Sequence, residues 1–494
     1  MQLGLLGHFL MVEVELKFQI PQARRQALLK AIDPKKSELI QLKAKYYDTK
    51  ERHLAQAHAA LRQRLEGHVW VQTFKAARKN HIERFEHNAV LGELEEAPEL
   101  NLAIYQNDAE ANSILQHALP TDAELALQFE TDIQRTQRVL NFNNSEIEVS
   151  LDIGCIRTLS AETEVHEVEF ELKSGSIQDL LAFSFEWVKK YQLWLDIRSK
   201  AEIGNLLAQG EMVSPAVLAK DFQLVKKDSS EKNLRALIAQ QLQHLLPNIA
   251  AISANVATQA HIDQAQNALA HLQLTTTLFK DWNAQLSEKF SAQLSAFKQQ
   301  FDHLQHLEHM QATLGAFLQN PKTQQQLQQD ILYSKEKLFN LVRSTLNVHH
   351  YLELLMFSLD VDHSAQQDLK SSAQQSLQQQ YKLLHEQLNH TTVHDFEQLD
   401  MLALRIHELK FSFPILTSIY DVKNLQKYSK ALNDAYLAAK EYQILASSAV
   451  YLQQTELEAS DWFVLGWLTA KQEVYAERLL EAAEQFMVSR KLIK

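Results

Sequence analysis

The stretch Val12-Glu13-Val14-Glu15-Leu16-Lys17-Phe18 alternates apolar and charged residues with a period of two. This alternation predicts a β-strand with its apolar side chains on one face and its charged side chains on the other. Glu13, Glu15 and Lys17 would then stand in a row, about 6–7 Å apart along the strand. Such a row is either a solvated face of a sheet or the wall of a site that holds a divalent metal and phosphate together.

The composition is that of a globular protein with two or three domains: 494 residues, of which 46% are hydrophobic and 22% charged. The formal net charge of −12 argues against a broad nucleic-acid-binding surface. Cys155 is the single cysteine, which excludes an internal disulfide and favours a reducing, cytoplasmic location. No apolar run approaches the roughly 18 residues that span a bilayer, so no membrane partner is expected.

The distribution of glycine divides the chain into two parts. Eight of the ten glycines lie at or before Gly210, and glycine favours turns over helices. We therefore predict an N-terminal extension of residues 1–10, a β-rich domain of residues 11–208, a linker of residues 209–215 and an all-α domain of residues 216–494. The functional chain is expected to begin at Met11, directly before the first strand.

Proline and leucine positions outline the helices of the all-α domain. Apolar residues recur with helical spacing from Leu234 to Leu246 and predict its first helix. Pro247 is expected to end this helix, and Pro321 and Pro414 are expected to mark further breaks.

Other segments of the β-rich domain repeat the alternation, but each carries mostly one sign of charge. The acidic positions are Glu146, Glu148, Asp152, Glu167, Glu169 and Glu171, and the basic positions are Arg62, Arg64, Lys75 and Arg84. A solvated sheet face usually mixes signs, because cross-strand neighbours of like charge repel. Closing the sheet into a barrel with these faces inward would set acidic and basic walls against each other across a lumen.

A lumen of this kind suits a ligand made of metal and phosphate. Mg²⁺ and Mn²⁺ prefer carboxylate oxygen and water as ligands. Arginine and lysine hold phosphate oxygens. Burying such charges unpaired costs several kcal/mol per ion. The metal and the ligand would therefore be needed to compensate the charges of the lumen.

The ordered motifs of residues 11–208 resemble the CYTH family, the triphosphate tunnel metalloenzymes. The Glu-x-Glu-x-Lys motif of that family stands here as Glu13-Val14-Glu15-Leu16-Lys17. The further matches are, in order, Tyr46-Tyr47-Asp48-Thr49, Leu61-Arg62-Gln63-Arg64, Thr73-Phe74-Lys75, Arg84-Phe85-Glu86, Phe129 to Arg135, Glu146 to Gly154, Glu167 to Leu172, and Ser199-Lys200. The first motif alone would be weak evidence, but nine blocks in the right order make the resemblance specific.

The resemblance implies an α+β domain: an eight-stranded antiparallel β-barrel that encloses a tunnel, with flanking helices. It also implies metal-dependent hydrolysis of triphosphates, with Glu13, Glu15 and Lys17 as the catalytic motif. Carried over by position, the phosphate-binding residues would be Lys17, Arg62, Arg64, Lys75, Arg84, Arg135 and Lys200. The ligands of Mg²⁺ or Mn²⁺ would be Glu13, Glu15, Glu86, Glu148, Asp152, Glu169 and Glu171.

The helical half resembles the CHAD domain of bacterial CYTH–CHAD proteins, which are commonly inorganic triphosphatases. A CHAD domain implies two four-helix bundles whose basic helices can bind polyphosphate. The positions that depart from its two signature helices are Asp263, Gln266, Ala270, Gln273 and Asp400, whereas Arg405 and Lys410 are kept. These losses of basic residues predict a degenerate CHAD domain, an all-α helical bundle, and argue against polyphosphate binding by this half.

We predict that the protein hydrolyses inorganic tripolyphosphate to pyrophosphate and orthophosphate. The alternatives are hydrolysis of thiamine triphosphate or a nucleoside triphosphate, or cyclisation of ATP to cyclic AMP, because the same tunnel chemistry serves all of these. A protein that binds polyphosphate without turnover is a different class, and the many carboxylates argue against it. A helical scaffold that positions the enzyme on a partner could coexist with catalysis.

Overall fold

The computed structural model describes residues 12–78, 80, 82–283, 286, 288–315, 317–360, 368–420 and 425–488. The predicted extension of residues 1–10 and the start at Met11 lie outside these residues. By its internal contacts the chain divides into two compact units. The barrel unit comprises Met1–Val217, Leu246–His261 and Leu341–Asp360, and the helical unit comprises Leu218–Leu245, Ile262–Asn340 and Val361–Lys494. The linker and the domain bounds read from the sequence stay predictions.

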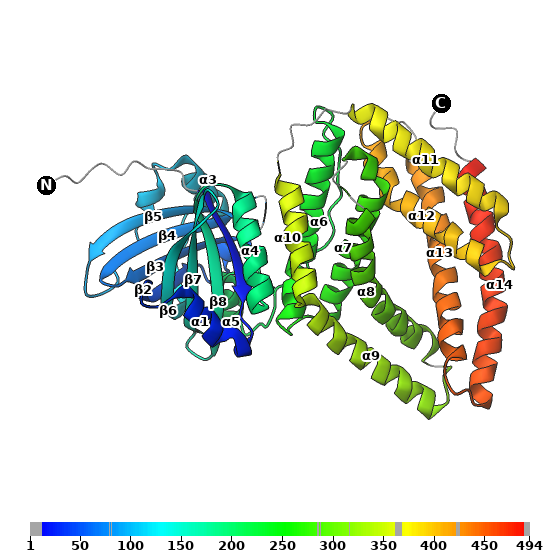
Figure 1. The fold of residues 1–494 in the computed structure, drawn as a ribbon, viewed down its shortest axis with the longest axis horizontal. Helices are drawn as coiled ribbons and strands as arrows, with labels where there is room; N and C mark the ends of the chain where they lie inside the picture. The colour runs from blue at the N-terminus through cyan, green and yellow to red at the C-terminus, as the bar shows by residue number, and fades with distance from the viewer. Residues whose placement is uncertain are drawn as a thin grey trace. The chain divides into compact units, whose positions relative to one another are not determined.

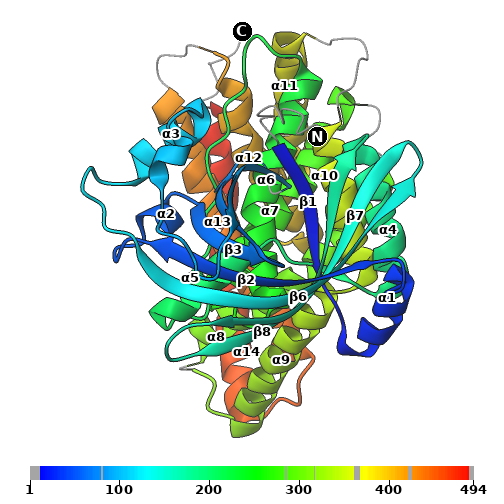
Figure 2. The same cartoon turned by 90° about the vertical axis from the view of Figure 1, so that its left-hand side faces the viewer.

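The barrel unit contains a closed antiparallel β-barrel of eight strands, as predicted (Figures 1 and 2). The strands are β1 (Val12–Gln19), β2 (Glu38–Asp48), β3 (Ala59–Glu66), β4 (Val69–Ala77), β5 (Glu83–Glu93), β6 (Ala126–Phe142), β7 (Ser145–Arg157) and β8 (Glu162–Ser174). Their order is β5-β4-β3-β2-β6-β7-β8-β1, and pairing of β1 with β5 closes the barrel. The short strand β9 (Trp194–Leu195) extends the edge of β1.

Helices cover the apolar outer face of the barrel. Leu16 and Phe18 of β1 are buried, and Phe18 contacts Phe170 of β8 with ring centroids 5.3 Å apart. Phe170 in turn packs edge-on against Phe183 of α4 (Ile177–Tyr191). The alternation of the sequence therefore orients the strands as expected, since the apolar side chains meet helices and the charged ones face the lumen.

The helices that precede β6 in the sequence are short. They are η1 (Gln22–Arg24), α1 (Arg25–Ile32), α2 (His53–Gln56), η2 (Leu102–Tyr105) and α3 (Ala109–Ala118). Tyr105 and Leu115 belong to an apolar cluster with Phe74 and Phe85, which point outward from β4 and β5. The outward direction of Phe74 and Phe85 sends the neighbouring Lys75 and Arg84 into the lumen.

Helix α5 (Lys200–Gln209) packs against the inner face of the barrel. Its residues Ala201, Ile203 and Leu207 contact a cluster that contains Phe129 and Ile133. Ile133 lies two residues before Arg135 on β6 and so shares its face. One part of the lumen is therefore apolar and filled by a helix, and Lys200 stands at the start of that helix.

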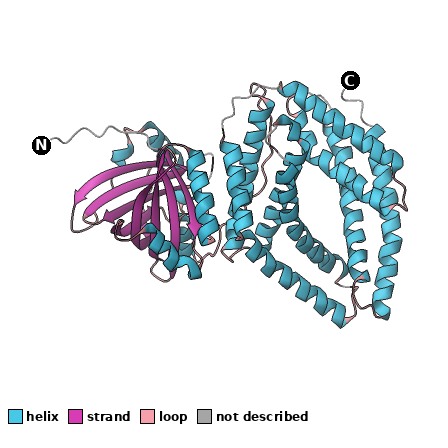
Figure 3. Ribbon diagram, viewed as in Figure 1, coloured by secondary structure: helices cyan, strands magenta, loops and turns pink. Residues whose placement is uncertain are grey.

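The predicted all-α domain of residues 216–494 contains helices and no strands among the residues that the structure describes (Figure 3). This confirms the prediction of an all-α architecture. The helices are α6 (Ser230–Ser253), α7 (Gln259–Leu278), η3 (Lys280–Trp282), α8 (Glu288–Leu314), α9 (Pro321–Val342), α10 (Thr345–Leu359), α11 (Leu369–His390), α12 (Phe396–Thr417), α13 (Leu425–Gln453) and α14 (Ala459–Val488).

Two of the three breaks predicted at prolines are wrong. Pro321 begins α9 as expected, but Pro247 lies inside α6 and Pro414 inside α12. A proline within a helix loses one backbone hydrogen bond. Burial of apolar residues on both sides of each proline, such as Leu246 and Ile249, or Phe413 and Ile415, offsets this loss.

Gly204 of α5 offers a test of the packing inside the barrel. A Cβ added at Gly204 would clash with the ring of Phe129, so we expect Gly204→Ala to lower the free energy of unfolding by about 1–3 kcal/mol. Gly466 of α14 is the matched control, because a Cβ there meets no atom within 4 Å. Gly466→Ala should raise helix stability by about 0.5–1 kcal/mol. Denaturant unfolding measures both changes, and equal effects of the two variants would contradict the packing of α5 inside the barrel.

Candidate active site

The register of the barrel puts the predicted charged residues next to one another on its inner face. The cross-strand pairs are Glu15 with Glu171, Lys17 with Glu169, Glu148 with Glu171, Asp152 with Glu167, Arg135 with Asp152, and Lys75 with Glu86. Carboxylates of β1, β7 and β8 thus lie beside one another, although neighbouring like charges destabilise a sheet. Some of these carboxylates belong to two clusters, each built around a lysine.

The Lys75 cluster consists of Glu13, Lys75 and Glu86. The Lys75 Nζ atom lies 2.7 Å from the Glu13 carboxylate and 3.1 Å from that of Glu86. Burial raises the pKa of Glu13 to about 8, because Lys75 opposes this shift only in part while Glu15 and Glu86 add to it. Burial also acts on Glu86, but Lys75 and Arg62 outweigh it and lower its pKa to about 2. Glu13 therefore holds a proton up to a higher pH than Glu86 does.

The Lys200 cluster consists of Arg135, Asp152, Glu167, Glu169 and Lys200. The Lys200 Nζ atom lies 2.6 Å from Asp152, 2.5 Å from Glu167 and 2.8 Å from Glu169. Arg135 binds Asp152 through two hydrogen bonds of 2.7 Å and reaches Glu169 at 2.5 Å. Five charges thus share one buried site, where such groups are stable only when paired.

The pKa values of the Lys200 cluster follow from this pairing. Burial alone would raise the pKa of Asp152 and of Glu169, but Lys200 and Arg135 outweigh it and lower both. At Glu167, burial dominates over Lys17 and Lys200, so its pKa is raised. Lys17, 3.8 Å from Glu167, is itself buried.

The other predicted residues pair along the same face. Arg84 lies 3.4 Å from Glu15, and Lys173 lies 2.9 Å from Glu171 and 3.9 Å from Glu148. Arg62 donates to the Tyr46 hydroxyl at 3.3 Å, and Arg64 contacts Glu66.

Two lumen residues were missing from the predicted site. Burial would raise the pKa of Tyr46, but Arg62 outweighs it and lowers that pKa, so Tyr46 is part of the electrostatics of the lumen. Glu167 contacts Lys200 and Lys17. The alternation that identified Glu169 and Glu171 includes Glu167 and could have identified it.

The Lys200 cluster has the donor set of a divalent metal site. One carboxylate oxygen from each of Asp152, Glu167 and Glu169 lies within 4.8 Å of the others, and hard cations such as Mg²⁺ and Mn²⁺ prefer such oxygens. Lys200 contacts the same three carboxylates, so its ammonium and a metal ion would compete for them. A polyphosphate that drew Lys200 toward its own oxygens would release the carboxylates for a metal.

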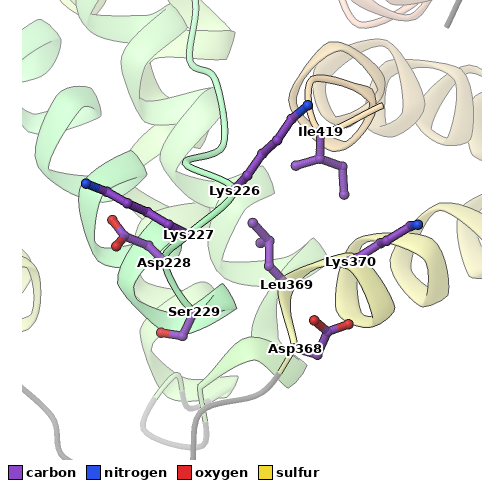
Figure 4. Close-up of a pocket in the computed structure, with 8 residues that line it drawn as sticks. All are labelled: Lys226, Lys227, Asp228, Ser229, Asp368, Leu369, Lys370 and Ile419. Atoms are coloured by element: carbon purple, nitrogen blue, oxygen red, sulfur yellow. The ribbon is translucent and has the colours of Figure 1, made fainter. Parts of the chain in front are cut away.

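A cavity of about 460 Å³ lies in the helical unit, where α6 and α11 begin (Figure 4). Its charged lining residues are Lys226, Lys227, Asp228, Asp368 and Lys370. Figure 4 shows the three lysine side chains pointing in different directions, so their ammonium groups do not converge on one ligand. The charged side chains that converge on one another are those of the barrel lumen.

Replacing Lys200 tests the electrostatic role of this residue. Lys200→Met keeps the length of the side chain but leaves three carboxylates facing one another, so we expect it to lower the free energy of unfolding by about 3–5 kcal/mol. Because a divalent cation can take the place of the ammonium, Mg²⁺ or Mn²⁺ should raise the melting temperature of the variant more than that of the wild type.

The control for this test is Lys36→Met, which removes a lysine that is 69% exposed. Thermal unfolding with and without metal measures the effect. A Lys200→Met variant as stable as the Lys36→Met variant would contradict the role of Lys200 in compensating the three carboxylates.

Residues 11–202 of the chain match the CYTH domain family. The chain is 31% identical over 173 residues to an inorganic triphosphatase of Haemophilus influenzae, an alignment that covers 34% of this chain and 46% of the relative. The chain thus spans about half the length of that curated relative. No helix within the described residues is both long enough and apolar enough to cross a bilayer.

Two solved structures are similar to this chain at low identity. A CHAD domain from the plant Ricinus communis covers 57% of this chain and 99% of its own, with 14% identity and a TM-score of 0.49. A Hippeastrum protein described as having a dominant triphosphatase activity covers 41% of this chain and 97% of its own, with 15% identity and a TM-score of 0.28. TM-scores this low carry no argument about function.

Proposed function

We propose, on the premise that residues 11–202 are a CYTH domain, that the barrel hydrolyses inorganic tripolyphosphate to pyrophosphate and orthophosphate with Mg²⁺ or Mn²⁺. The observation that carries this proposal is the pairing of acidic and basic side chains within one lumen, where Lys200 and Arg135 contact carboxylates that could also hold a metal ion. The inorganic substrate is supported by the similarity to the inorganic triphosphatase of Haemophilus influenzae. The single, free Cys155 supports a reducing, cytoplasmic location.

The chain's own residues divide into two roles in this proposal. Phosphate oxygens would be held by Lys17, Arg62, Arg64, Lys75, Arg84, Arg135 and Lys200. The metal would be held by carboxylates from the set Glu13, Glu15, Glu86, Glu148, Asp152, Glu169 and Glu171, to which the geometry adds Glu167. A divalent metal supplies Lewis acidity, which polarises phosphoryl oxygens and acidifies water.

Binding would exchange ion pairs within the lumen for ion pairs with the substrate. Lys75 and Lys200 contact carboxylates within the lumen, and the oxygens of a triphosphate would compete for both ammonium groups. Arg62 and Arg135, fixed by Tyr46 and Asp152, keep their guanidinium groups oriented. Such preorganised cations stabilise the negative charge that grows on the leaving pyrophosphate.

Hydrolysis of organic triphosphates and cyclisation of ATP remain the alternatives, because the basic side chains assigned above would recognise the phosphate groups alone. Binding of polyphosphate without turnover is disfavoured, since carboxylates at the phosphate site would repel the ligand without a metal between them. We assign no polyphosphate binding to the helical half, where the basic residues of the signature helices are largely replaced.

Phosphate release tests the activity. With Mg²⁺ or Mn²⁺ the wild type should hydrolyse tripolyphosphate with a kcat/KM at least ten times that for ATP or thiamine triphosphate. Glu13→Ala and Lys17→Ala should each lower kcat/KM by a factor of about 10² or more, since each removes a group that contacts metal or phosphate. Lys36→Met serves as the control and should leave activity unchanged. Absence of metal-dependent turnover of all three substrates would refute the enzyme assignment.

The pKa of Glu13 predicts how metal binding depends on pH. Because burial raises this pKa to about 8, a metal that binds Glu13 at pH 7 must displace a proton. We expect the apparent metal affinity to rise by up to about tenfold per pH unit until pH 8 and then to level off.

Titration calorimetry at pH 7 in buffers of different ionisation enthalpy counts the released proton. In Glu13→Gln the proton release should vanish. The stability of the metal-free protein depends on pH in the opposite direction to the metal affinity. The folded state holds the Glu13 proton more tightly than the unfolded chain does. The free energy of unfolding therefore falls as the pH rises from 4.5, the ordinary pKa of a glutamate, to about 8. A pH-independent metal affinity would contradict Glu13 as a ligand.

A further inference from the structure

The edge of β1 that closes the barrel is paired in two separate places. Val12, Glu13 and Val14 pair with β5, and Phe18 and Gln19 pair with β9. Between these ladders the edge makes single backbone bonds: Glu15 donates to the Ile82 carbonyl at 2.9 Å, and the Lys17 carbonyl accepts from the Asp196 amide at 3.1 Å. The barrel wall is thus interrupted beside the Glu-x-Glu-x-Lys motif.

A cavity of about 10 Å³ lies at this interruption. Its lining includes the charged residues Glu15, Lys17 and Arg84 together with Leu246 of α6 and Leu355 of α10. This volume holds about one water molecule. Leu246 and Leu355 are buried, so two aliphatic side chains from distant parts of the sequence line this cavity next to charges assigned to metal and phosphate.

Contacts within the barrel unit fix the segments that carry the two leucines. Helix α10 packs against α4 and β9, and the His349 ring contacts the Phe185 carbonyl of α4 at 3.1 Å. Arg343, two residues before α10, donates to the Ser253 carbonyl at the end of α6 at 2.6 Å. Its guanidinium also lies 4.2 Å from the ring centre of Trp194 in β9. These contacts hold the segments that carry Leu246 and Leu355 against the barrel.

We infer that Leu246 and Leu355 are specificity-determining residues that restrict the tunnel to short polyphosphates, an inference that rests on the proposed function. A fourth phosphoryl group in this direction would press charged oxygens against leucine methyl groups, where they lose hydration and gain no hydrogen bond. An unfavourable contact of this kind selects against the longer chain without strengthening the binding of the shorter one. The leucines act on the end of the substrate and take no part in the chemistry.

The test compares tripolyphosphate with tetrapolyphosphate on the full-length protein. Leu246→Ala and Leu355→Ala remove the wall and admit water, so the ratio of kcat/KM for tetrapolyphosphate to that for tripolyphosphate should rise roughly tenfold or more. Leu352→Ala is the matched control, because Leu352 is buried in the same helix and is not among the residues that line the cavity. Leu355→Val removes a single methylene and preserves the fold if the alanine variants fail to express.

The possible outcomes separate this inference from the proposed function. A ratio that rises for the two wall variants and not for Leu352→Ala supports the inference. An unchanged ratio, or an equal rise for Leu352→Ala, overturns it. If the wild type hydrolyses neither compound, the proposed function fails, and the inference is judged by ligand-induced shifts in melting temperature. Tetrapolyphosphate must then stabilise the wall variants more, relative to tripolyphosphate, than it stabilises the wild type.

Discussion

The contact of the Lys200 ammonium with Asp152, Glu167 and Glu169 is the interaction on which the charged lumen depends. A closed barrel brings carboxylates of neighbouring strands together on its inner face, where like charges repel and water is scarce. Lys200 lies within 2.8 Å of all three carboxylates, and Arg135 of the neighbouring strand β6 binds two of them. Without these cations the three carboxylates could not remain ionised side by side.

The position of Lys200 follows from the helix that it begins. Helix α5 packs inside the barrel through Ala201, Ile203 and Leu207, and Gly204 allows the helix to approach Phe129. The apolar part of the lumen thus anchors the helix, and the charged part receives its first residue. Packing and electrostatics therefore depend on each other. The hydrophobic contacts of α5 position Lys200, and Lys200 compensates the carboxylates that strand pairing brings together.

Much of the site was predictable because strand alternation is a local property of the sequence. Glu13, Glu15 and Lys17 face the lumen as their spacing indicates, and the single-sign strands pointed to a closed barrel. The paired groups within the lumen were not predictable in the same way. The ordered motifs assigned Glu13, Lys75 and Glu86 to one site, but they did not indicate that Lys75 contacts both carboxylates or that burial raises the pKa of Glu13 to about 8. The helix breaks predicted at Pro247 and Pro414 were wrong, because packing outweighed the local preference against proline in helices.

Periodicity and ordered motifs were enough to predict the two architectures, the inward face of each charged strand and most of the residues that face the lumen. The folded chain alone shows that α5 packs on the inner face of the barrel, that Glu167 completes a trio of carboxylates, and that Leu246 and Leu355 line a cavity beside Lys17. These features depend on contacts between residues far apart in the chain, and such contacts are set by the packing of apolar surfaces and the pairing of buried charges, which no local pattern contains.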